Sequence, residues 1–169
     1  TTRIRDLLQV ARAALGEDAG TLSPRAQAEL DLMTAHDALA TSPILGTDID
    51  YSLFTPRGHY TRSKALTRYF LAMSVLGQTA FALPGADQFS GEEADRSGLR
   101  LAALASRPLV GDPGLEATWR EIYEPTAFLV GLADDYTPFE LAAAIEAAVP
   151  GGLADPALLA GDEAIDAVA

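Results

Sequence analysis

Two polar and aromatic segments of the sequence carry the residue types that bind anions and transfer protons. The first segment, residues 50–63, contains Arg57, His59, Tyr60 and Arg62. Arginine side chains match carboxylate and phosphate groups with paired hydrogen bonds, which favours an anion- or sugar-binding pocket. The alternative is a structural role, in which the same residues brace the loop through hydrogen bonds to carboxylates and backbone. Both interpretations follow from these residue types.

The second segment provides carboxylates. Glu124 precedes Pro125, which disfavours helical geometry at the residue before it, and we therefore predict a helix break there that turns the carboxylate inward. Glu124 with Asp134 or Asp135 could form the acid/base pair of a glycosidase-like hydrolase, which needs two carboxylates about 5–10 Å apart. Alternatively, the two aspartates stabilise the dipole of a helix that starts at Thr137.

Aromatic side chains accompany these carboxylates, and Trp119, Tyr123 and Tyr136 could stack on a sugar ring. At helical spacing, however, Trp119 is more typical of a core. The predicted ligand-binding residues of the two segments are Arg57, His59, Tyr60, Arg62, Tyr123, Glu124, Asp134 and Asp135.

The net charge of −12, from 12 Lys and Arg against 24 Asp and Glu, argues against a nucleic-acid partner and an anionic membrane surface. Residues 57–107 carry seven basic against four acidic residues, whereas residues 108–169 carry one against twelve. We expect these two regions to attract each other. The predicted contact joins Arg57 and Arg62 to Glu124, Asp134 or Asp135.

The sequence lacks residue types and motifs that several kinds of active site and metal site require. Without cysteine, the chain has no disulfide, thiolate metal site or cysteine nucleophile, and its two histidines cannot build a tetrahedral His/Cys site. No nucleotide-binding loop, serine-hydrolase elbow or zinc-protease motif occurs, so we predict no cofactor and no metal. The longest apolar run, residues 127–133, is too short to span a bilayer. The scarcity of Asn, Cys and Met is compatible with a heat-adapted source.

Helix starts are the clearest structural signals. A capping residue directly followed by proline supplies a side-chain acceptor and a residue that needs no N–H, which predicts helix starts. These pairs are Ser23–Pro24, Asp112–Pro113, Thr137–Pro138 and Asp155–Pro156, and we add Ser90 with Glu93 and Thr61 as further starts. The pair Thr137 and Glu140 also forms a capping box.

Apolar residues at helical spacing predict the buried faces. Two stripes each end at a glycine, one at Gly16 and one at Gly77. Their members are Ile4, Leu7, Leu8, Ala11 and Leu15, and Leu66, Tyr69, Phe70, Met73 and Leu76. No long stretch alternates with period two, so no strand is predicted.

We therefore predict an all-α fold with about seven short helices, forming a single irregular domain over residues 1–169. Residues 42–60 and 77–89 are expected to be two long loops. Within the first, Gly58 permits an unusual backbone angle. We also expect the chain to be a fragment or isolated domain of a longer protein, whose remainder could be its partner.

Three runs of sequence, residues 50–63, 66–73 and 119–138, together resemble the central part of the domain-of-unknown-function family numbered 3160. The resemblance spans residues 42–141. It implies a prokaryotic protein of unknown function, exported or anchored at the cell envelope, and no catalytic residues. Where the family pattern continues with an aromatic-glycine-arginine cluster, this chain has residues 74–78 without arginine. We thus expect a helical domain that binds an unidentified small molecule or protein. The alternative is a glycosidase-like hydrolase that uses the paired carboxylates together with Arg57 and His59.

Overall fold

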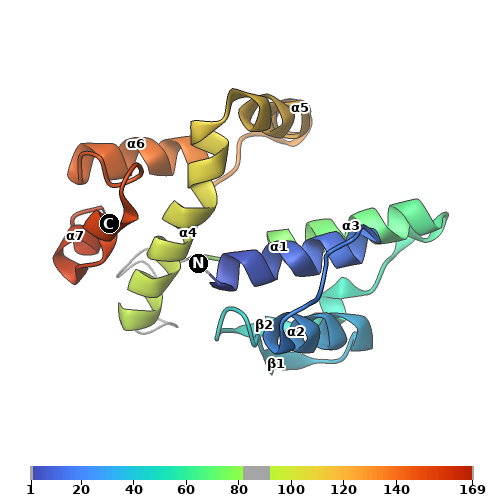
Figure 1. Ribbon diagram of the computed structural model, residues 1–169. Helices are drawn as coiled ribbons and strands as arrows, with labels where there is room; N and C mark the ends of the chain where they lie inside the picture. Colours follow the sequence, from blue (N-terminus) through green and yellow to red (C-terminus); the bar gives the residue numbers. More distant parts are fainter. Residues whose placement is uncertain (1, 82–91, 169) are drawn as a thin grey trace. The chain divides into compact units, whose positions relative to one another are not determined.

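The computed structural model describes residues 2–81 and 92–168, and its contacts divide the chain into two units, Thr1–Ala80 and Phe81–Ala169. Each unit is described by itself. Figure 1 draws the first from blue to green and the second from yellow-green to red. Among the described residues the fold is predominantly α-helical with seven α-helices, as predicted.

The first unit consists of three α-helices and a small hairpin. Its helices are α1 (Thr2–Leu15), α2 (Pro24–Ala35) and α3 (Lys64–Gly77), and its strands are β1 (Leu39–Thr41) and β2 (Asp48–Asp50). Two 3₁₀ turns, η1 (Tyr51–Phe54) and η2 (Gly58–Thr61), connect β2 to α3. The strands pair antiparallel, with Ala40 opposite Ile49.

The second unit consists of four α-helices. They are α4 (Glu92–Gly111), α5 (Pro113–Val130), α6 (Pro138–Ala148) and α7 (Asp162–Asp166), and a 3₁₀ turn, η3 (Pro156–Leu159), precedes α7. With 20 and 18 residues, α4 and α5 are longer than the short helices we predicted.

Three of the predicted cap–proline pairs start α-helices. Ser23, Asp112 and Thr137 each accept hydrogen bonds from backbone N–H groups of the first turn. Thr137 also forms the predicted capping box with Glu140. The pair at Asp155 starts only the 3₁₀ turn η3. Ser90 lies outside the described residues.

Two predictions about the region before α3 are wrong. The helix begins at Lys64 after the cap Ser63, whose side chain accepts from Leu66 N–H, rather than after Thr61, which ends η2. The predicted loop over residues 42–60 also contains β2 and η1, and β1 lies just before it. A three-residue strand is too short for a period of two to be visible in the sequence.

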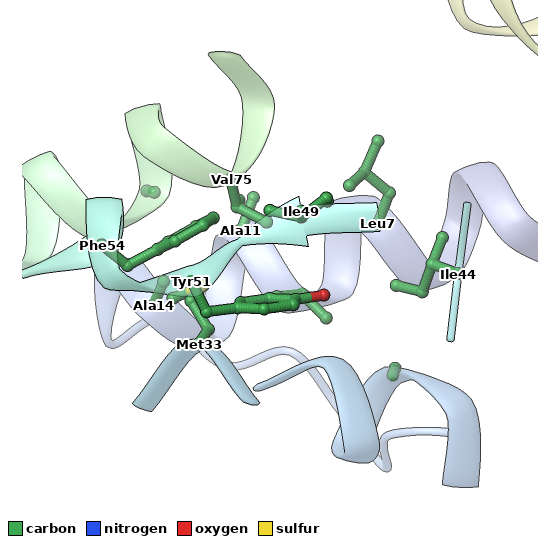
Figure 2. Packing of buried hydrophobic residues seen from close by; sticks show 12 residues of the cluster. Leu7, Ala11, Ala14, Met33, Ile44, Ile49, Tyr51, Phe54 and Val75 are labelled. Carbon is green, nitrogen blue, oxygen red and sulfur yellow. The ribbon is translucent and has the colours of Figure 1, made fainter. Parts of the chain in front are cut away.

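The core of the first unit lies between α1, α2, α3 and the hairpin. Figure 2 shows side chains from these four regions converging, among them Ala11, Met33, Ile49 and Val75. Phe54 is fully buried, and burial of such a side chain contributes about 1.5–3 kcal/mol to folding.

The predicted apolar stripes only partly match the buried faces. In α1, Leu7 and Ala11 are buried as expected, but Leu8 and Leu15 are exposed. In α3 the residues buried in the core are Ala72 and Val75. The exposed members of the predicted α3 stripe are Tyr69, Met73 and Leu76. Small side chains on the buried face allow α3 to pack closely beside α1 (Figure 1).

Two acidic side chains are buried in the first unit. The carboxylate of Asp6 accepts hydrogen bonds from Ser23 and Arg25, which fixes α1 against the start of α2. The carboxylate of Glu29 accepts from Ser42 and Tyr51, which fixes α2 against both ends of the hairpin. Buried carboxylates need such donors, because burial without them is costly.

The core of the second unit is built mainly from α4 and α6, against which the C-terminal turns pack. Its buried members are Leu99, Ala103, Leu141, Ile145, Leu159 and Ile165. Arginines of α4 hold the C-terminal turns from outside. Arg96 pairs with Asp166, and Arg100 binds Asp162 and the carbonyl of Leu159. These ion pairs join basic residues from the middle of the chain to acidic residues near its end. They account for a part of the attraction predicted between the two regions.

Candidate functional site

The first unit contains an open hollow of about 470 Å³ beside η2 and α3. Arg57, His59 and Tyr60, three of the residues predicted to bind a ligand, line it together. The other lining residues are Leu53, Gly58, Phe70, Ser74 and Gln78. The predicted residue Arg62 is exposed and does not line this hollow.

The shape of η2 depends on Gly58, whose φ of +56° lies in the left-handed region that glycine adopts without strain. This confirms the unusual backbone angle predicted there. The turn places the ring of Tyr60 near those of His59 and Phe70, with centroids 4.0 and 5.0 Å away. The hydroxyl of Thr67 in α3 donates to the carbonyl of Tyr60 at 2.9 Å, so the turn is fixed to the helix.

The α3 wall of the hollow was not predicted from the sequence. Phe70, Ser74 and Gln78 follow one another at four-residue intervals, which places them on one face of the helix up to its C-cap. This spacing was the signal available in the sequence. The spacing did not single out these residues, because Phe70 also fits the apolar stripe that we assigned to the core.

The lining combines two kinds of surface. Arg57 and His59 are exposed and can reach a negatively charged group at the mouth, while Leu53 and Phe70 provide apolar wall. Ser74 and Gln78 add a hydroxyl and an amide that can donate or accept hydrogen bonds. The hollow therefore suits a small molecule that has both an anionic group and an apolar part.

A second hollow of about 300 Å³ lies at the start of α3. Its lining is polar and cationic, and consists of Thr61, Ser63, Lys64, Thr67 and Arg68. This makes the surface around the N-terminus of α3 attractive to anions in general.

The remaining predicted residues belong to the second unit. Tyr123 stacks on Trp119, with ring centroids 4.4 Å apart and planes 16° apart, so one face of the indole is covered. Phe139 of α6 lies edge-on to the same indole at 5.1 Å. Trp119 is thereby held in an aromatic cluster between α5 and α6, half-buried rather than fully in the core.

The predicted helix break at Pro125 is wrong. α5 continues through Pro125 to Val130, because a proline inside a helix removes one hydrogen bond without preventing the following turns. Glu124 consequently lies on the exposed helix surface, 3.3 Å from Arg120 one turn earlier. Asp134 and Asp135 are exposed in the segment after α5.

The predicted contact of Arg57 and Arg62 with acids of the second segment stays a prediction, since the arginines belong to one unit and the acids to the other. Among the described residues, no three His, Asp or Glu side chains gather as a metal site would require. None of the described helices has the length and apolarity of a membrane span.

The fold and the hollow define a mainly helical protein with a candidate ligand-binding surface. The profile of a family of proteins of unknown function, DUF3160, matches residues 2–167. The chain therefore belongs to the DUF3160 family, in agreement with the resemblance seen in the sequence. No curated protein and no solved structure matches it.

Proposed function

We propose that the first unit binds a small organic anion in the hollow lined by Arg57, His59 and Tyr60. The observation that carries the proposal is the convergence of these three residues with an apolar wall and two hydrogen-bonding side chains of α3. The ligand class is a carboxylate or phosphate ester with a ring or short aliphatic chain.

The charge of the lining supports an anion. The chain as a whole is strongly acidic, whereas the lining of the hollow contains Arg57 and no acidic residue. Because Arg57 is exposed, its attraction for the ligand is screened by salt, and the apolar wall has to supply part of the affinity.

The setting of Glu124 favours binding over the glycosidase-like alternative. A general acid usually has its pKa raised by an apolar or like-charged surrounding. Glu124 is instead exposed and hydrogen-bonded to a guanidinium. Tyr123 is stacked on Trp119, so its ring on that side is not free for a sugar.

The test is a titration with phenyl phosphate and phenylacetate, followed by amide NMR shifts of the full chain. We expect Kd below about 1 mM, equivalent to roughly −4 kcal/mol. The shifts should gather at residues 57–60 and 70–78. The neutral analogue 2-phenylethanol should bind at least tenfold more weakly.

Matched variants separate the site from general charge. Arg57→Ala should weaken binding of both anions about tenfold or more, whereas Arg12→Ala removes an exposed arginine of α1, away from the hollow, and should have no effect. Phe70→Ala should weaken phenylacetate more than inorganic phosphate. Equal effects of Arg57→Ala and Arg12→Ala, or shifts confined to the residues around Lys64, would contradict the proposal.

A further inference from the structure

The second unit exposes an unusual amount of apolar side chain on α5. This 18-residue helix has no fully buried residue. Its last turn and the following segment carry four large apolar side chains that are at least 79% exposed, which we call the apolar end of α5. They are Phe128, Leu129, Val130 and Leu132. Contiguous apolar surface of this kind marks an interaction site.

The exposed apolar residues continue along the helix. Leu115, Ile122 and Leu129 are 45%, 55% and 79% exposed and follow one another at seven-residue intervals. Two turns of helix contain about seven residues, so the three side chains form one stripe. Seven-residue spacing of apolar residues is the pattern by which one helix packs along another, so the stripe suits a helical partner.

The charge around this surface selects the partner. Glu121 and Glu124 lie on the same stretch of α5, and Asp134 and Asp135 follow the apolar end directly; all four are exposed. Arg120, the single basic residue after position 107, is already paired with Glu116 and Glu124. A partner helix with lysine or arginine beside its apolar residues would complement the carboxylates of Glu121, Asp134 and Asp135, whereas Glu124 is already paired with Arg120.

The same carboxylates argue against other occupants. A symmetric dimer through α5 would place this acidic surface against itself, since a twofold interface uses the same patch on both copies. An anionic lipid surface would be repelled as well. We infer that the exposed stripe and apolar end of α5 form a docking surface for a cationic amphipathic helix of another polypeptide.

The first measurement asks whether the surface is free in the unbound protein. Because the chain has no cysteine, Leu129→Cys introduces a unique thiol at a 79% exposed position. We expect a maleimide to label it in the folded protein as fast as a thiol in a short peptide. A thiol protected tenfold or more in the native protein would overturn the inference.

The second measurement uses a defined partner. A fluorescent 18-residue peptide of leucine and lysine, with leucine on one helical face, should bind the full chain. The double variant Ile122→Ser/Leu129→Ser should raise its Kd at least tenfold, and Asp134→Lys/Asp135→Lys should raise it several-fold. Leu39→Ser, at a 66% exposed leucine of β1, is the matched control and should leave Kd unchanged.

Three results would overturn the inference. One is a leucine/glutamate peptide that binds as tightly as the leucine/lysine peptide. Another is sedimentation that reveals a dimer of the wild type which the Ile122→Ser/Leu129→Ser variant loses, because a second copy would then be the occupant. The third is leucine/lysine binding that the double variant does not weaken. None of these outcomes depends on the hollow near Arg57, so this inference and the proposed anion site fail separately.

Discussion

The guanidinium of Arg25 is hydrogen-bonded through both Nε and Nη2 to a single carboxylate oxygen of Asp6, with Nε at 2.8 Å. Asp6 is fully buried, whereas the Arg25 side chain remains 33% exposed. Ser23 donates to the other carboxylate oxygen at 3.0 Å while its own oxygen caps α2. The pair thus joins the middle of α1 to the first turn of α2.

This pair makes the first unit sensitive to acid. Burial alone would raise the pKa of Asp6, but the hydrogen bonds from Arg25 and Ser23 outweigh burial and hold the pKa below its ordinary value. The stabilisation is therefore present above the unfolded-state pKa of about 3.9 and is lost as the pH falls through the lower pKa of the folded state. Asp6→Asn should lower the free energy of unfolding by on the order of 2 kcal/mol at pH 7.

Urea unfolding between pH 2 and pH 7 measures both effects. The Asp6→Asn variant should lose less stability than the wild type on acidification. Asp37→Asn, at an exposed aspartate after α2, is the control and should follow the wild-type curve. If Asp6→Asn lost as much stability as the wild type on acidification, other carboxylates would be the main cause of the acid sensitivity.

The hydrogen bond from Tyr51 to Glu29 predicts sensitivity to alkali. Burial, followed by the bond to the Glu29 carboxylate, raises the pKa of Tyr51. The folded state keeps the phenol neutral where the unfolded chain ionises near pH 10, so stability is lost as the pH rises above that value. Tyr51→Phe should lower the free energy of unfolding by about 1–3 kcal/mol at pH 7, because Glu29 loses a hydrogen-bond donor. The variant should also lose less stability than the wild type as the pH rises above about 10.

Thermal unfolding between pH 7 and pH 11 tests this. The matched control is Tyr136→Phe, which removes the hydroxyl of a tyrosine that is 65% exposed. We expect it to change neither the stability at pH 7 nor the loss of stability at alkaline pH. A Tyr51→Phe variant as stable as the wild type at pH 7 would contradict a structural role for the buried network.

Arg100 is expected to order the C-terminal turns of the second unit. It donates to the carbonyls of Leu159 and Ala160 and to the carboxylate of Asp162, and so binds the end of η3 and the start of α7. Arg100→Ala should increase amide exchange across residues 156–168 about tenfold. Arg3→Ala, in α1, should leave exchange there unchanged.

The capping box of α6 gives a prediction of helix stability. Thr137 accepts from the Glu140 N–H, and Glu140 in return accepts from both the N–H and the hydroxyl of Thr137. Thr137→Ala should cost about 1 kcal/mol, whereas Thr137→Ser should cost little. Urea denaturation of both variants compares them, and equal losses would mean that the hydroxyl is not the stabilising group.

Local signals in the sequence predicted the structure best. The cap–proline pairs at Ser23, Asp112 and Thr137 act within one helical turn, so the fold could not easily override them. At Thr61 and Ser63, two capping residues compete, and only the geometry of η2 decides between them. At Asp155 the predicted start is present, but the residues that follow form the four-residue 3₁₀ turn η3 rather than an α-helix.

The burial of individual residues and the full set of residues around the hollow could not be predicted from the sequence, because both depend on tertiary contacts. Nothing local distinguishes Asp6 and Glu29 from exposed acids, because their donors come from other elements. Arg57, His59 and Tyr60 could be grouped because they are adjacent in the sequence. Phe70 could not be added to them, since its role depends on how α3 is rotated against α1.

Pro125 has a consequence for the apolar end of α5. Its nitrogen cannot donate to the carbonyl of Glu121, so the helix lacks one backbone hydrogen bond about one turn before Phe128. The last five residues of α5 are therefore connected to the preceding turn by one backbone hydrogen bond fewer than in an uninterrupted helix. An incoming helix could adjust their angle to its own without breaking a bond at that position, which gives one exposed surface some tolerance for differently shaped partners.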